Sequence, residues 1–205
     1  MGGSRKPWVC WPTPWPECTA AANASTGPSC TASGASSCYG RVRPRARARG
    51  IAQLRQGLTA LKAAGSETYR TYFLALLAEA LGKEGQVEEG LGVLAEALAL
   101  IQETDEGFNA AELHRLRGEF LLQRETTEAT SREAEACFRH ALTIARQQQA
   151  RSLELRAAMS LTRLYRKQNR HAEVRPILAE CYGWFTEGFD TPDLQEAQAL
   201  LEPCS

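Results

Sequence analysis

The chain has 205 residues, of which 43% are hydrophobic and 23% charged, a composition typical of a globular protein with one domain or one domain and a tail. No stretch approaches the roughly 18 consecutive apolar residues of a membrane span, and no apolar run typical of a secretory signal follows the basic start. The sequence therefore excludes an integral membrane protein, and we expect a cytoplasmic chain with reduced cysteines and no membrane partner.

Residues 1–49 differ in composition from the rest of the chain. They hold seven Lys or Arg residues and one acid, Glu17, and so carry about +6 in a chain whose formal net charge is zero. They contain six of the nine prolines but no Leu, Ile, Phe or Asp. A segment with so little aliphatic surface cannot offset the entropy lost when it is ordered. We therefore predict a disordered or non-native tail over residues 1–49.

The cysteines give no sign of a metal site. The tail cysteines are separated by spacings wider than the turns of about two to four residues found in zinc sites; they are Cys10, Cys18, Cys30 and Cys38. We expect neither a metal nor a cofactor. Cys137 and Cys181 fall on apolar or small-residue faces and are predicted to lie in the core.

The segment Arg41–Arg49 places five arginines in nine residues. A nucleic-acid arm would bind phosphates with steeply salt-dependent affinity, whereas a flexible linker would be extended by charge repulsion. A third interpretation is translation in the wrong frame. One coding of RARARG, translated from its third base, gives Gly-Glu-Gly-Glu-Gly, which is similar to GQVEEG at 85–90. We favour this out-of-frame interpretation and rank nucleic-acid binding lowest.

From Ile51 onward, apolar residues recur at helical spacing and predict an all-α domain over residues 50–190. Four segments within it can be stacked without gaps: LRQGLTALKAAG (54–65), LAEALALIQETD (94–105), FRHALTIARQQQ (138–149) and LAECYGWFTEGF (178–189). Each begins with a bulky apolar residue and has a small residue three positions later. Their offsets of 40, 44 and 40 residues indicate a repeated unit.

The repeated unit is predicted to be a pair of helices joined by a turn. YFLALLAEALGKEGQVEEGLGVLAEAL shows the whole unit, with Gly85 in the turn. In the next unit we expect a polar loop four residues longer, which accounts for the offset of 44. Small residues stand at Ala78 and Gly118 in first helices and at Gly90 and Ala134 in second helices. We expect the helices to approach each other closely at these positions.

This arrangement resembles the tetratricopeptide repeat, a helix–turn–helix unit that stacks into a superhelix. The resemblance covers about residues 50–183, although the period exceeds the usual value of about 34 and the family's tryptophan is missing. The phrases LAEALALI, AELHRLRGE, AEACFRHAL and YGWFTEGFDTPDLQEAQALLE are similar to the ends of bacterial signalling proteins that join a class III nucleotide cyclase domain, an ATPase module and a repeat array. The resemblance implies a tetratricopeptide-like α-solenoid that is the C-terminal fragment of such a protein.

Residues 191–205 are expected to supply a capping helix. Thr191 can cap it, Pro192 suits its first position, and Asp193 is favourable for the helix dipole. The segment DLQEAQALLE would then cover the exposed face of the preceding repeat. By contrast, Ile51–Leu61 resembles the second helix of a repeat whose first helix is missing.

A search for enzymatic motifs finds none that is complete. The one Gly-Lys pair is followed by Glu84 and lacks the first glycine of a phosphate-binding loop, so it predicts a helix end. His114, His140 and His171 are far apart in the sequence, without an HExxH motif, and we expect surface or groove positions for them. We predict a non-catalytic interaction or regulatory module. The alternative is the sensor region of a cyclase or ATPase whose catalytic domains are absent from this chain.

The resemblance also implies where a protein or peptide partner would bind. In such repeats the first helix of each pair lines a groove, and the polar residues carried over to it are Tyr72, Glu79, Lys83, Arg115, Glu119, Arg156, Arg163, Arg166 and Lys167. The third of these helices is basic, which suits an acidic peptide or a partner helix. The alternative is a solvated charged face without a ligand.

Overall fold

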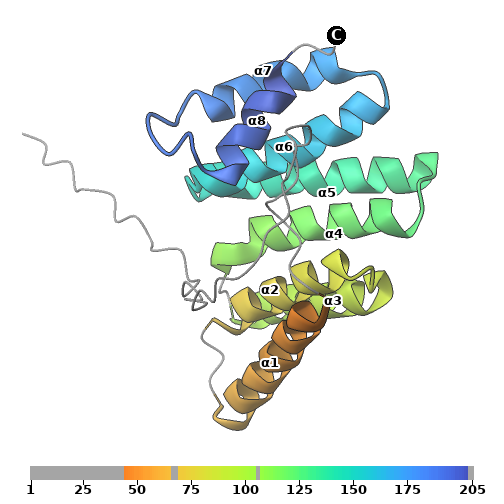
Figure 1. Ribbon diagram of the computed structural model, residues 1–205, viewed down its shortest axis with the longest axis vertical. Coiled ribbons are helices and arrows are strands. Elements are labelled where there is room, and N and C mark those ends of the chain that lie inside the picture. Colours follow the sequence, from red (N-terminus) through yellow and green to blue (C-terminus); the bar gives the residue numbers. More distant parts are fainter. Residues whose placement is uncertain (1–43, 66–68, 105–106, 203–205) are drawn as a thin grey trace, which may run out of the picture. The chain divides into compact units, whose positions relative to one another are not determined.

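A computed structural model describes residues 44–65, 69–104 and 107–202 (Figure 1). These residues form helices and contain no strand, which confirms the all-α class. The helices are α1 (Pro44–Ala63), α2 (Arg70–Lys83), α3 (Val87–Thr104), the short 3-10 helix η1 (Gly107–Asn109), α4 (Ala110–Arg124), α5 (Glu128–Gln147), α6 (Arg151–Lys167), α7 (His171–Tyr182) and α8 (Pro192–Leu201). None of these described helices is long and apolar enough to cross a membrane. The tail cysteines lie outside the described residues.

Helix α1 begins at Pro44, inside the segment assigned to the tail from its composition. Proline is favoured at the first position of a helix, and arginine and alanine both have high helix propensity. The arginine run therefore continues into the helix, and Arg47 lies 3.5 Å from the carboxylate of Glu84, directly after α2. Helix α1 thus includes the last residues of the segment 1–49.

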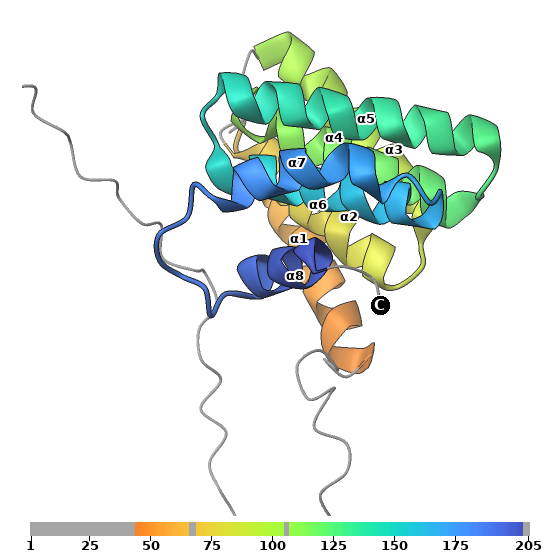
Figure 2. The ribbon, with the colours of Figure 1, turned by 90° about the horizontal axis from the view of Figure 1, so that it is seen from above.

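The helices that follow α1 pack against their neighbours in chain order (Figure 1). Helix α2 packs against α3, α4 against α5, and α6 against α7, while α3 also contacts α4 and α5 contacts α6. The first helices of these pairs, α2, α4 and α6, form a further series of contacts with one another. Helix α8 packs against α6 and α7, on the side of α6 away from α5 (Figure 2).

The connection between α2 and α3 is the turn expected at Gly85. Its φ angle of +75° lies in the left-handed region, which glycine adopts without steric cost. The amides of Glu84 and Gln86 both donate to the carbonyl of Leu81, at 3.1 and 3.0 Å, and so satisfy the end of α2.

The offset of 44 residues has a different origin from the one expected. The loop between α4 and α5, residues 125–127, is no longer than the loop between α2 and α3, residues 84–86. The extra residues instead form an additional first turn of α5, about one helical turn. A capping box stabilises this turn, because the Thr130 amide donates to the Thr127 hydroxyl at 3.2 Å and the Thr127 amide to the Thr130 hydroxyl at 2.9 Å.

The repeated bulky and small residues form the core in three of the four copies. These residues are at most 1% exposed: Leu94, Phe138, Leu178, Ala97, Ala141 and Cys181. Cys137 is also buried, so the predicted core positions of both cysteines are confirmed. In α1, by contrast, Leu54 is half-buried and Gly57 is exposed with no atom near its missing side chain. There Ile51 takes the buried place against α2.

Close helix crossings occur at the predicted small residues. Ala78 and Ala134 are completely buried. A Cβ atom added to Gly90 would lie 2.7 Å from the Phe120 ring, and one added to Gly118 would lie 2.5 Å from the Phe138 ring. Each glycine therefore makes room for an aromatic ring from the next helix, which fixes the distance between neighbouring helices.

Candidate functional site

A hollow of about 330 Å³ lies between α2, α4, α6 and α8. We call it the central hollow. Its charged lining consists of Glu79, Lys83, Arg115, Glu119, Arg156, Arg163, Asp193 and Glu196. Apolar atoms of Leu116, Phe120 and Met159 contribute to its wall. The hollow exists because the first helices of the pairs contact one another and present their polar positions to the same side.

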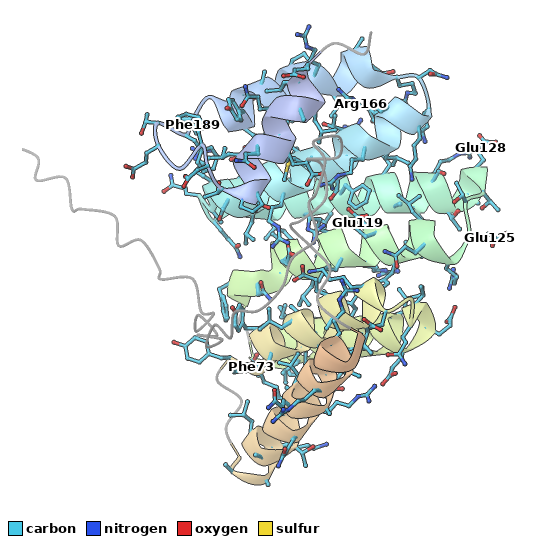
Figure 3. The ribbon with its side chains drawn as sticks, viewed as in Figure 1. Phe73, Glu119, Glu125, Glu128, Arg166 and Phe189 are labelled. Carbon is cyan, nitrogen blue, oxygen red and sulfur yellow. The ribbon has the colours of Figure 1, made fainter. Side chains whose placement is uncertain are left out.

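Six of the nine groove residues predicted from the sequence line the central hollow: Glu79, Lys83, Arg115, Glu119, Arg156 and Arg163. The other three do not line it. Tyr72 is half-buried with its ring edge-to-face against Phe73, at 5.7 Å between centroids. Arg166 donates to two backbone carbonyls at the end of α8, and Lys167 is exposed at the end of α6. Figure 3 shows Glu119 and Arg166 on their separate helices.

Arg115, which lines the central hollow, forms a buried ion pair with Glu112, and both residues lie on α4. The Arg115 guanidinium donates to the two carboxylate oxygens of Glu112 at 2.8 and 2.9 Å. Both residues are at most 7% exposed. Burial by itself raises the pKa of Glu112, but the hydrogen bond and charge of Arg115 and the charge of Arg156 bring this pKa below its usual value. Arg115 therefore supports the hollow and is not free to meet a ligand.

A second polar cluster joins α4 to α6 beside this pair. Ser160, which is 1% exposed, donates its hydroxyl proton to the Glu119 carboxylate at 2.7 Å. The guanidinium groups of Arg115 and Arg163 both lie 3.3 Å from the Ser160 hydroxyl oxygen. Because these groups are mutually satisfied, the cluster holds the two helices in one register.

Two arginines of α6, Arg156 and Arg163, are paired with acids from other helices. Arg156 lies 2.9 Å from Glu112 of α4 and 3.8 Å from Asp193 of α8. Arg163 lies 2.6 Å from Glu196 of α8 and 3.5 Å from Glu119 of α4. With Glu79 and Lys83 included, the hollow is lined by four acidic and four basic residues. The positive charges of Arg156 and Arg163 are thus balanced by acids of α4 and α8.

Two of these ion pairs follow the repeat register. Glu112 and Arg156 are separated by 44 residues, as are Glu119 and Arg163, so both pairs join α4 and α6 in the same register. Equivalent positions of neighbouring first helices therefore carry opposite charges. The sequence analysis missed Glu112, Asp193 and Glu196, although a comparison of charges at equivalent repeat positions would have shown the first of them.

The structure brings together two histidines that are distant in the sequence. The rings of His114 on α4 and His140 on α5 meet edge-to-face, at 4.4 Å between centroids. Burial, together with the charges of His140 and Arg117, lowers the pKa of His114 to about 4. Among the described residues there is no group of three or more His, Cys, Asp or Glu side chains that could hold a metal ion.

This histidine predicts a pH dependence of stability. His114 has an ordinary pKa of 6.5 when unfolded and about 4 when folded, so the unfolded chain binds its proton more readily. Its contribution is complete above pH 6.5 and is lost as the pH falls toward 4. We expect His114→Gln to reduce this loss in urea unfolding experiments over that range. Carboxylates such as Glu112 affect the pH dependence of stability mainly below pH 4.5. If the free energy of unfolding of His114→Gln changes with pH above 4.5 as steeply as that of the unchanged protein, the assignment to His114 is contradicted.

In comparisons with known proteins, no family model and no curated protein sequence matches this chain. Its function is therefore inferred from the geometry and chemistry of its own residues.

Proposed function

We propose that the protein is a non-catalytic interaction module of tetratricopeptide type that binds a segment of a partner protein in the central hollow. One observation carries this proposal: α2, α4 and α6 bring six separately predicted polar residues to a single hollow. The alternation of inner helices α2, α4 and α6 with outer helices α3, α5 and α7 supports a solenoid-like stack. A cytoplasmic regulatory role in a bacterial signalling protein is part of the same proposal.

The chemistry of the hollow suits a peptide segment. Several ion pairs at its rim are partly exposed, such as Lys83 with Glu79 at 2.8 Å, where the lysine side chain is 61% exposed. Pairs of this kind contribute only about 0–1 kcal/mol, so a ligand's charges can replace them at little cost. The buried apolar groups between them, including Leu116 and Met159, would receive a small apolar side chain.

The alternative proposal is that the chain is the sensor region of a nucleotide cyclase or ATPase protein. The sequence phrases that resemble such proteins support it, and the same hollow would then receive the regulatory partner. Translation of the DNA upstream of the region encoding residue 44 in all three frames separates the two proposals. Cyclase or ATPase motifs in that DNA would favour the interpretation that this chain is a fragment of a cyclase or ATPase protein.

Nucleic-acid binding by the arginine run ranks lowest among the proposed functions, since part of that run lies in α1.

A matched pair of charge reversals tests the interaction proposal. Lys83 lines the hollow, whereas Lys167 occupies the equivalent place at the end of α6 but lies outside it. Peptides selected from a random displayed library against the full chain are expected to bind Lys83→Glu at least about ten-fold more weakly, a loss of about 1.4 kcal/mol. Binding to Lys167→Glu should stay unchanged. Isothermal titration with the selected peptides measures both affinities.

Each outcome of this titration has a defined meaning. Equal losses in the two variants would show that peptides respond to overall charge and would contradict a site in the hollow. No loss in either variant would place the binding surface elsewhere. Circular dichroism of both variants is the control for folding, and we expect it to match the unchanged chain because both lysines are exposed.

A further inference from the structure

Helix α8 engages three arginines spaced along one side of α6: Arg156, Arg163 and Arg166. We call them the arginine row. Asp193, in the first turn of α8, lies 3.8 Å from Arg156, and Glu196 accepts from Arg163 at 2.6 and 2.9 Å. At the other end of α8, Arg166 donates to two backbone carbonyls that have no partner within the helix. The row therefore contacts the acidic side and the negative end of one helix.

Apolar contacts accompany these charges. Leu194 and Ala197 of α8 are 4% and 0% exposed, and they pack into a cluster that includes Met159 and Leu178. Acidic and apolar positions thus alternate on the docked side of a short helix. The features of α8 that α6 contacts are an apolar stripe, two acidic residues three positions apart beside it, and the C-terminal end of the helix near Arg166.

Two arginines of the row, Arg163 and Arg166, contact the α8 segment more closely than the body of the protein, whereas Arg156 lies 2.9 Å from Glu112 of α4 and 3.8 Å from Asp193 of α8. Arg163 lies 3.5 Å from Glu119 of α4, against 2.6 Å from Glu196 of α8. Arg166 donates to the carbonyls of Leu200 in α8 and of Glu202 directly after it. Removal of α8 would therefore turn the balanced lining of the central hollow into a basic one beside exposed apolar atoms.

We propose that the arginine row is a docking site for an acidic amphipathic helix of a partner protein, and that α8 occupies this site as an internal competitor. This inference rests on the proposed interaction function and specifies the class of partner. Because residues 183–191 tether α8, its effective concentration at the site is on the order of millimolar, and an external helix must compete with it. Partner binding and release of α8 are then coupled.

Peptide binding to the full chain, with α8 displaced by charge reversal, tests this proposal. The double variant Asp193→Lys/Glu196→Lys places lysines of α8 against the arginine row. Release of α8 should appear as faster amide hydrogen exchange over residues 192–201. A fluorescent peptide of residues 188–202 is expected to bind this double variant at least about ten-fold more tightly than the unchanged chain. Fluorescence anisotropy measures the affinity, and the same peptide carrying both lysine substitutions is the matched control.

A third change tests whether the row itself is the site. Arg163→Glu, added to the double variant, should weaken binding of the acidic peptide and strengthen binding of the lysine peptide. Three results would each overturn the proposal. The two peptides could bind with equal affinity, α8 could stay protected from exchange in the double variant, or α8 could be released without any peptide binding. An unchanged chain that exchanges α8 within a dimer, detected by light scattering, would assign the site to a second copy instead. The Lys83→Glu titration is independent of all these results, so failure here and failure of the proposed function are distinguishable.

Discussion

Replacing Phe138 with alanine is expected to lower the free energy of unfolding by about 3–5 kcal/mol, the range found for large aromatic residues in protein cores. Phe138 is completely buried, and its ring fills the space over Gly118 where α4 and α5 cross. Its loss leaves a cavity at the junction of two helix pairs. Urea unfolding followed by circular dichroism measures the change.

The effect of Gly118→Ala on stability should change sign when Phe138 is also replaced. In the unchanged protein, Gly118→Ala places a Cβ atom 2.5 Å from the Phe138 ring, and overpacking of this kind costs about 1–3 kcal/mol. With Phe138→Ala present, the ring is gone and the higher helix propensity of alanine should stabilise the chain by up to about 1 kcal/mol. Gly92→Ala is the control, because no atom lies within 4 Å of its added Cβ and it should stabilise both backgrounds. Additive effects at residues 118 and 138 would contradict the predicted contact.

Replacing Arg115 with methionine should cost about 3 kcal/mol at neutral pH. The change leaves the buried Glu112 carboxylate without its bidentate partner, and breaking such a pair costs about 3–5 kcal/mol. We expect the lower end because Arg156 still lies 2.9 Å from Glu112. The exposed pair of Arg132 with Glu128 on α5 is the control, and Arg132→Met should change stability by less than about 0.5 kcal/mol.

The pH dependence of this variant provides a stricter test. In the unchanged protein the pKa of Glu112 lies below its ordinary value of 4.5, so this group's contribution is lost as the pH falls through that region. Without Arg115, burial raises the pKa, and the ionised carboxylate destabilises the fold above it. The cost of Arg115→Met should therefore shrink as the pH is lowered from 7 toward 4. A cost independent of pH would show that lost packing, and not the unpaired charge, causes the instability.

The repeat register was predictable because packing leaves a local trace in the sequence. Bulky and small residues recur at fixed spacing because the same helix contacts recur, which is why Leu94, Phe138 and Leu178, at one position of the repeat, are all buried. Details of helix ends were less predictable. The polar residues at 125–131 favour a loop by composition, yet the Thr127–Thr130 capping box makes most of them a helical turn. The start of α1 at Pro44 was missed because composition alone does not report helix propensity.

The sequence by itself determined the helical class and the pairing of helices, because these depend on spacing along one chain segment. Six of the residues that line the central hollow were implied by the resemblance to tetratricopeptide repeats. Only the tertiary structure decided the electrostatics of that hollow. Its charge depends on acids that α4 and α8 bring within 2.6–3.8 Å of the α6 arginines from 33 to 44 residues away. Coulomb interactions act through space and not along the chain, so a helix that is basic in sequence lines a neutral surface in the fold.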